Sequence, residues 1–158
     1  MPIKNFIHRV MRPSALTALG VAALTMTELA LAQDIRVAHV YDKTGPLEAY
    51  AKQTQTGLLM GLEFATGGTM TVAGHKITVI ERDTQGKPDV AKSQLAAAYA
   101  DDKADIAVGP TSSGVALAML PVAEEYRKLL LVEPAVADAI TGDKLSLIHI
   151  SEPTRRTP

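Results

Sequence analysis

The chain has no cysteine and no tryptophan, and aromatic residues make up only 4% of its 158 residues. The lack of cysteine excludes disulfide bonds, thiolate nucleophiles, thiolate metal ligands and a lipid attached to an N-terminal cysteine. The chain also lacks an excess of either charge, since 16 lysine and arginine residues stand against 17 aspartate and glutamate residues. A nucleic-acid partner normally requires a basic surface, so this balance argues against one. Hydrophobic residues make up 47% of the chain, which excludes disorder and supports about one packed domain.

The first 32 residues have the layout of an export signal. A positively charged segment comes first, with Lys4, Arg9 and Arg12. An apolar segment follows at 16–24, and an Ala-x-Ala cleavage pattern at 30–32 precedes Gln33. The alternative is an uncleaved membrane anchor, but this apolar run is shorter than the roughly 20 residues that a spanning helix needs. We therefore expect a cleaved signal peptide over residues 1–32 and a mature periplasmic protein.

From Gln33 onward, strand patterns alternate with helix patterns. Strands are predicted at 35–40, 76–82, 106–108 and 129–132, with a turn or short hairpin at 71–75. Helices are predicted at 49–66, at 89–100 and directly after residue 113. Short apolar runs separated by helices predict an α/β fold with an open parallel sheet flanked by helices on both faces.

The stretch 105–114, with the sequence DIAVGPTSSG, combines a short strand, a turn of small residues and the start of a helix. Ser113 is predicted as the N-cap, where the first helical turn offers unpaired N–H groups and the positive end of the helix dipole. Such a junction favours a small anion such as a carboxylate. The alternative is that Ser112 and Ser113 only cap the helix.

Three loops decide between these two interpretations. In open parallel sheets, ligands bind beyond the carboxyl ends of the strands, where the strand order reverses. The loops expected there are 44–50, 109–113 and 133–138, and each contains glycine or proline among small or hydroxyl residues. Because three loops share this character, we favour a ligand-binding role for the serine pair.

These loops also carry a resemblance to a known family. Thr44-Gly45-Pro46 with Tyr50, followed by the motifs at 109–113 and 133–137, resembles the periplasmic substrate-binding proteins of branched-chain amino acid ABC transporters. The resemblance implies a type I periplasmic binding protein, with two α/β lobes and a hinge that closes on the ligand. Residues 33–144 would form part of the N-terminal lobe. The implied partners are a small-molecule ligand, an amino acid or other carboxylate, and the membrane permease of an ABC transporter.

The resemblance also implies roles for single residues. Ser113 matches a serine that holds the ligand carboxylate, Ala135 a residue whose carbonyl accepts from the ligand ammonium, and Tyr50 an aromatic residue that lines the cleft. Ala137 departs from the pattern, because leucine-type binders have a threonine there whose hydroxyl accepts from the ammonium. An alanine cannot accept that bond, which opens the site to other aliphatic or aromatic carboxylates. The predicted ligand-binding residues are Tyr50, Thr111, Ser112, Ser113, Ala135 and Ala137.

The main alternative is an exported enzyme on the same open α/β plan. The turn after the first strand is not the Gly-x-Gly-x-x-Gly of a dinucleotide fold, and the sequence has no Walker loop and no Gly-x-Ser-x-Gly elbow. A sensor domain of a receptor would use the same lobe but needs a membrane span. The histidines lie apart without ligand spacing, so we predict no metal site and no cofactor. We expect a binding protein, not an enzyme.

The segment 145–155, LSLIHISEPTR, differs in character from the rest of the chain. It matches, codon by codon, the in-frame translation of a common transposon-end sequencing adapter. The alternative is a short strand at 147–150 followed by a polar end broken by Pro153. We favour the adapter interpretation, which makes residues 145–158 non-native and the chain a fragment holding part of one lobe.

Overall fold

The computed structural model describes residues 33–144 and the backbone of residues 149–151. The predicted signal peptide, residues 1–32, lies outside the described residues, and so does most of the predicted adapter-derived tail.

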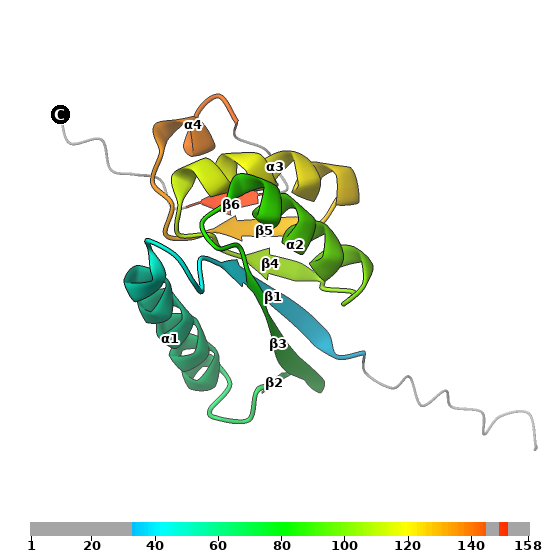
Figure 1. Cartoon of the computed structure of the whole chain (residues 1–158). Coiled ribbons are helices and arrows are strands. Elements are labelled where there is room, and N and C mark those ends of the chain that lie inside the picture. The colour runs from blue at the N-terminus through cyan, green and yellow to red at the C-terminus, as the bar shows by residue number, and fades with distance from the viewer. Residues whose placement is uncertain (1–32, 145–148, 152–158) are drawn as a thin grey trace, which may run out of the picture. The chain divides into compact units, whose positions relative to one another are not determined.

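Strands and helices alternate along the described chain (Figure 1). The elements are β1 (Ile35–Tyr41), α1 (Glu48–Ala65), β2 (Thr71–Val72), β3 (His75–Asp83), α2 (Pro88–Ala100), β4 (Ile106–Val108), α3 (Ser113–Tyr126), β5 (Leu129–Val132), α4 (Asp138–Thr141) and β6 (His149–Ser151). The predicted strands and helices up to β5 are confirmed to within a residue or so at each end. The turn or short hairpin predicted at 71–75 is a hairpin formed by β2 and the beginning of β3.

Local sequence explains where several helices begin and end. Pro88 is the first residue of α2, a position where the missing N–H costs no helical hydrogen bond. After α1 the chain passes through Gly67 and Gly68 with φ angles of 58° and 80°, a left-handed conformation that glycine adopts without strain. Arg127 takes a similar conformation after α3, with φ of 51°.

The strands form a six-stranded sheet in the order β2-β3-β1-β4-β5-β6. The short β2 is antiparallel to β3, and the other neighbours are parallel, with Val37 of β1 opposite Val79 of β3 and Ile106 of β4. The predicted open parallel sheet is confirmed, apart from the β2 hairpin. From β1 the chain first adds β3 on one side and then β4 on the other, so the strand order reverses between β1 and β4.

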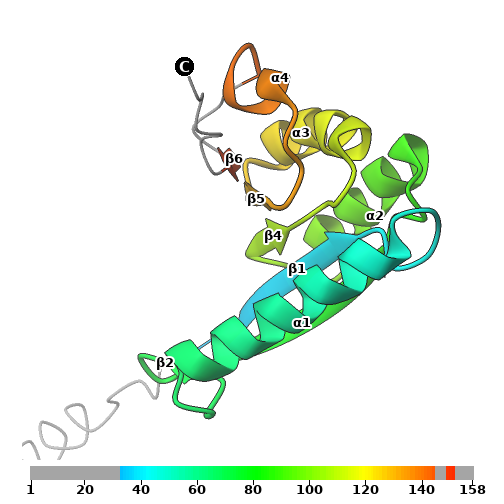
Figure 2. The same ribbon diagram turned by 90° about the vertical axis from the view of Figure 1, so that its left-hand side faces the viewer.

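Helices cover the sheet on both faces, but unequally (Figures 1 and 2). α2 and α3 pack on one face over the larger core, which includes Leu95, Met119 and Leu130. α1 lies on the other face, where its Leu58 packs against a smaller core that includes Val37. This face is left partly open beyond β1, since the β5 side chain of Leu131 is 36% exposed. The predicted helices on both faces of the sheet are confirmed, and α1 leaves part of its own face uncovered.

The last described element falls in the segment interpreted as adapter-derived. The backbone of β6 pairs in parallel with β5, with Leu131 opposite Ile150. A strand here is close to the alternative that the sequence left open. The rest of residues 145–158 lies outside the described part, and their non-native origin stays a prediction.

Candidate ligand-binding site

The three loops predicted to bind a ligand follow β1, β4 and β5, which are neighbours in the sheet. Because these strands run in parallel, their carboxyl ends meet at one edge. The loops after β1 and β4 flank the point where the strand order reverses, which is where ligands bind in open α/β sheets.

Gly109 brings the loop after β4 close to β1. Its φ angle is 122°, and a Cβ atom built on it would lie 2.2 Å from the carbonyl oxygen of Val40. No side chain fits there. The Gly109 N–H also donates to the carbonyl of Leu131 at 3.0 Å, which ties the loop to β5. This glycine therefore sets the position of the whole 109–113 turn.

The hydroxyl of Ser113 connects the second loop to the third. Its Oγ accepts hydrogen bonds from the N–H groups of Val136, at 3.1 Å, and Ala137, at 3.2 Å. Both bonds use lone pairs of the oxygen, so the hydroxyl proton can be donated to an anion. The structure thus brings Ser113 together with the 135–137 segment.

The prediction that Ser113 is the N-cap is wrong by one residue. Ser112 is the N-cap, and Ser113 is the first residue of α3. The Ser112 carbonyl accepts the first helical bond, from the N–H of Ala116 at 2.9 Å. The Ser112 side chain makes no capping bond, so neither serine serves the purely capping role of the alternative interpretation.

A buried carboxylate explains why the helix starts there. Asp42, directly after β1, is fully buried, and its Oδ2 accepts the Ser112 N–H at 2.8 Å. Its Oδ1 accepts the hydroxyl of Thr84, from the loop after β3. Asp42 thus connects the ends of β1, β3 and β4. In the sequence, Asp42 is only the first residue of the turn 42–46 after the predicted strand at 35–40, a position where aspartate is common.

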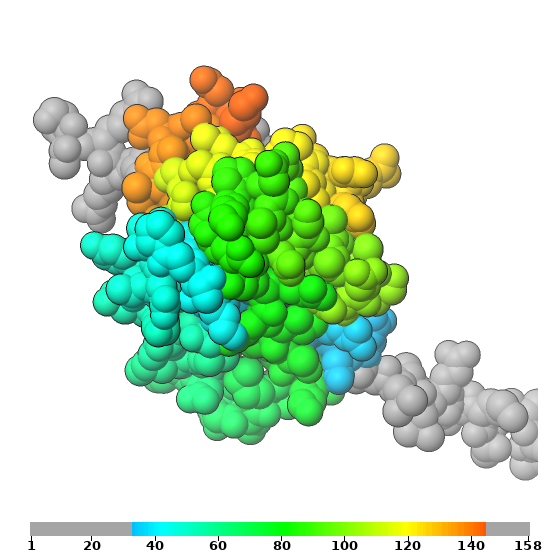
Figure 3. Space-filling model, viewed as in Figure 1, coloured from blue at the N-terminus to red at the C-terminus, as the bar shows by residue number. Residues whose placement is uncertain are grey.

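Tyr50 extends from the first turn of α1 and is 63% exposed. It lines a cavity of about 510 Å³ between α1 and the strands β4 and β5. Pro134, from the third loop, lines the same cavity. The residues that line it are Tyr50, Gln53, Thr54, Gly57, Leu58, Val108, Leu131, Glu133 and Pro134. Figure 3 shows the beginning of α1, in cyan, below the orange segment that contains this loop.

The remaining predicted residues occupy the same edge of the sheet. Ala135 and Ala137 are half-buried and pack against the larger core, and Ala137 precedes α4. The hydroxyl of Thr111 is buried and has no hydrogen-bond partner among the described residues. A buried hydroxyl without a partner is unfavourable, which makes Thr111 a candidate for contact with a bound molecule.

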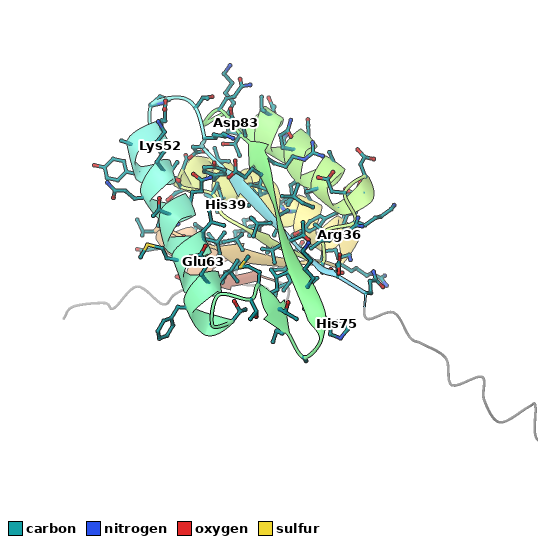
Figure 4. The ribbon with its side chains drawn as sticks, turned by 90° about the horizontal axis from the view of Figure 1, so that it is seen from below. Arg36, His39, Lys52, Glu63, His75 and Asp83 are labelled. Atoms are coloured by element: carbon teal, nitrogen blue, oxygen red, sulfur yellow. The ribbon has the colours of Figure 1, made fainter. Side chains whose placement is uncertain are left out.

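A polar cluster under α1 supports the start of this helix. The side chain of His39, a residue of β1, lies on the side of the sheet that faces α1 (Figure 4). Its ring stacks on Tyr41 with 4.0 Å between the ring centroids. Burial lowers the pKa of His39 to about 4, against a smaller raising effect of the Glu81 carboxylate. Glu81 in turn accepts from Gln55 of α1 and pairs with Lys43 at 2.7 Å. The cluster fixes α1 to the sheet and thereby positions Tyr50.

The described residues contain no group of three or more His, Asp or Glu side chains that could hold a metal ion. In the same part of the chain, no helix has both the length and the apolar character needed to cross a membrane.

Comparison with known proteins identifies the family to which this fold belongs. The model of the periplasmic binding protein family matches residues 34–148. The Leu/Ile/Val-binding protein BraC3 of Rhizobium johnstonii is 32% identical over 130 residues, which cover 80% of this chain and 34% of that protein.

Solved structures give the same result. An ABC-type branched-chain amino acid transporter protein from Rhodopseudomonas palustris is 62% identical, with a TM-score of 0.74 over 75% of this chain and 32% of that one. A solute-binding protein of Rhodopseudomonas palustris BisB5, in complex with 3,4-dihydroxybenzoic acid, is 27% identical, with a TM-score of 0.66 over 75% of this chain and 31% of that one. The chain spans about a third of the length of these relatives. It belongs to the periplasmic binding protein family.

Proposed function

We propose that this chain is part of an exported solute-binding protein that captures a small carboxylate-bearing solute, an amino acid or a related acid, for uptake by an ABC transporter. The observation that carries the proposal is the bonding of Ser113. Its oxygen is occupied by the N–H groups of Val136 and Ala137, which leaves the hydroxyl proton for an anion at the edge of the sheet.

The ligand carboxylate would bind at the start of α3. The N–H groups of Ser113, Gly114 and Val115 have no partner within the helix, and the positive end of the helix dipole favours a negative charge. Together with the Ser113 hydroxyl they form a set of donors without any cationic side chain. Charge-assisted hydrogen bonds of this kind are stronger than neutral ones.

The rest of the solute would extend towards Tyr50 and the third loop. The carbonyl of Ala135 is the proposed acceptor for an ammonium group, whereas Ala137 contributes only a methyl group. The relatives are compatible with both solute classes, since one is named for binding leucine, isoleucine and valine and another was solved with 3,4-dihydroxybenzoic acid. In the complete protein a second lobe would close over the solute by a hinge motion, so the function is binding without chemical conversion.

Calorimetry on the purified full-length protein tests this proposal. Leucine and dihydroxybenzoate are titrated separately, and the recovered solute is analysed by mass spectrometry. We expect saturable one-to-one binding of at least one of these acids and its recovery unchanged. Absence of binding to both acids would contradict the proposed solute class, and a chemically altered solute would support an exported enzyme instead.

A further inference from the structure

We infer that Asp42 restricts the proposed anchor to solutes whose anchoring group carries a single negative charge. This inference rests on the proposed function, because it concerns the selectivity of the same site. It makes Asp42 a positioning and specificity-determining residue that acts through Ser112 and its own charge, without touching the solute.

The geometry of Asp42 is that of a fixed internal anion. Its side chain is fully buried at the carboxyl end of β1. One carboxylate oxygen accepts the Ser112 N–H at 2.8 Å, and the other accepts the Thr84 hydroxyl. The Thr84 hydroxyl is itself held, since it accepts the N–H of Gly86 at 3.2 Å. These bonds fix the carboxylate directly beside the start of α3.

The carboxylate removes one donor from the proposed anchor. A helix start offers a series of N–H groups that a phosphate-like dianion can share. Here the N–H of Ser112, at the N-cap, is already bound to Asp42. A solute is left with the N–H groups from Ser113 onward and the Ser113 hydroxyl, a donor set suited to the two oxygens of a carboxylate.

The charge of Asp42 acts in the same direction. None of the ion pairs in the described part of the chain involves Asp42, and the neighbouring Lys43 pairs with Glu81. A helix dipole alone would attract a doubly charged group more strongly than a singly charged one. The buried negative charge of Asp42, bonded to the N–H of the residue before Ser113, opposes the second charge, because like charges repel strongly where water is excluded.

Matched carboxylate and phosphonate solutes test this inference. The affinities of leucine and of its phosphonic acid analogue are measured by calorimetry on the full-length protein, at a pH where the phosphonate is doubly charged. Dihydroxybenzoate and its phosphonate analogue form a second pair. We expect the wild-type protein to bind the phosphonate at least roughly tenfold more weakly than the carboxylate.

The variant Asp42→Asn removes the charge but keeps one acceptor oxygen, and the Thr84 hydroxyl can turn to accept from the new amide. We expect the preference for the carboxylate to fall by roughly tenfold in this variant. The matched control is Asp101→Asn, which makes the same charge change at an exposed residue after α2 and should keep the wild-type preference.

Three outcomes are decisive. Equal wild-type affinity for the two members of a pair overturns the inference, and this measurement does not depend on the folding of any variant. A folded Asp42→Asn protein with the wild-type preference also overturns it. Failure of the wild-type protein to bind leucine and dihydroxybenzoate contradicts the proposed function itself, and the selectivity inference falls with it.

Discussion

At the scale of single residues, Ser113 has two tasks in this account. Its oxygen accepts from the N–H groups of Val136 and Ala137 in the third loop. Its proton is proposed to be donated to the solute. Both tasks depend on one hydroxyl group. A substitution therefore affects solute binding directly and the loop position indirectly.

We predict that Ser113→Ala in the full-length protein weakens solute binding by about 1–3 kcal/mol, the range for losing a hydrogen bond to a charged group. The affinity is measured by calorimetry. Ser93→Ala is the matched control, because the Ser93 hydroxyl donates to the Asp89 carbonyl of its own helix, at 3.0 Å, away from the third loop. Unchanged affinity of Ser113→Ala would remove Ser113 from the site.

His39 gives a prediction about pH. Its pKa is lowered by burial from 6.5 to about 4, so between these values the unfolded chain binds a proton that the folded chain does not. Above pH 6.5 the His39 ring is neutral in both the folded and the unfolded state, and the full stability is present. As the pH falls from 6.5 towards 4, only the unfolded chain binds the proton, so the free energy of unfolding decreases. The expected loss is roughly 3 kcal/mol.

Denaturant unfolding across this pH range measures the effect. In His39→Phe, which keeps an aromatic ring against Tyr41, the decrease in stability over this range should be smaller than in the wild type by the His39 contribution. His75→Phe, which removes a histidine at the start of β3 and outside this cluster, is the control. Identical slopes for the wild type and His39→Phe would contradict the assignment.

The residues of the site were only partly predictable. Ser113 could be proposed from the sequence because small residues between a strand and a helix form a local pattern, and its role in binding stays a prediction. Asp42 could not, because its importance comes from the Ser112 N–H, 70 residues further along the chain. The N-cap was misplaced by one residue for the same reason. The long-range hydrogen bond from the Ser112 N–H to Asp42 fixes the start of the helix. The helix propensity of the neighbouring residues does not indicate such a bond.

At the scale of elements, the loop after β4 depends on a close approach of two backbones. Gly109→Ala should destabilise the protein by at least about 2 kcal/mol, because the added Cβ would overlap the Val40 carbonyl and the φ angle of 122° is strained for alanine. Thermal or denaturant unfolding measures the change.

The same chain offers a matched control for this prediction. Gly61 lies within α1, and a Cβ added there meets no atom within 4 Å. Gly61→Ala should therefore stabilise the protein by up to about 1 kcal/mol, through helix propensity alone. Comparable stability of the two variants would show that Gly109 is not sterically required.

Most elements were predictable, because their apolar runs are short, regular and bounded by glycine or proline. The predicted strand at 106–108 and the predicted helix at 89–100 agree with β4 and α2. How far α1 covers its face of the sheet was not predictable in the same way. Leu131 looks like a core residue in sequence, but the helix on its side of the sheet packs against a cluster from β1, β3 and β4 and leaves Leu131 at the wall of a cavity.

At the scale of the whole molecule, the chain corresponds to about a third of its relatives, and its first 32 residues are proposed to direct export. We predict that the protein recovered from the periplasm of a Gram-negative host begins at Gln33. Cleavage after 30–32 follows from the small residues that signal peptidase requires there. Mass spectrometry of the mature N-terminus checks this.

Two variants sharpen the export prediction. Ala32→Lys places a long charged side chain at the cleavage site and should leave the precursor unprocessed. Ala23→Leu keeps the apolar segment apolar and should be processed normally. Recovery of the wild-type protein in the membrane fraction with its first residues intact would contradict a cleaved signal.

The loops after β1, β4 and β5 are proposed to form one anchor for a carboxylate. Backbone amide chemical shifts of the full-length protein, recorded during titration with leucine or dihydroxybenzoate, test it most directly. We predict that within the described residues the largest changes occur at 112–115, at 135–137 and around Tyr50. Saturable binding with these amides unchanged, and the changes confined to other parts of the sheet, would contradict it.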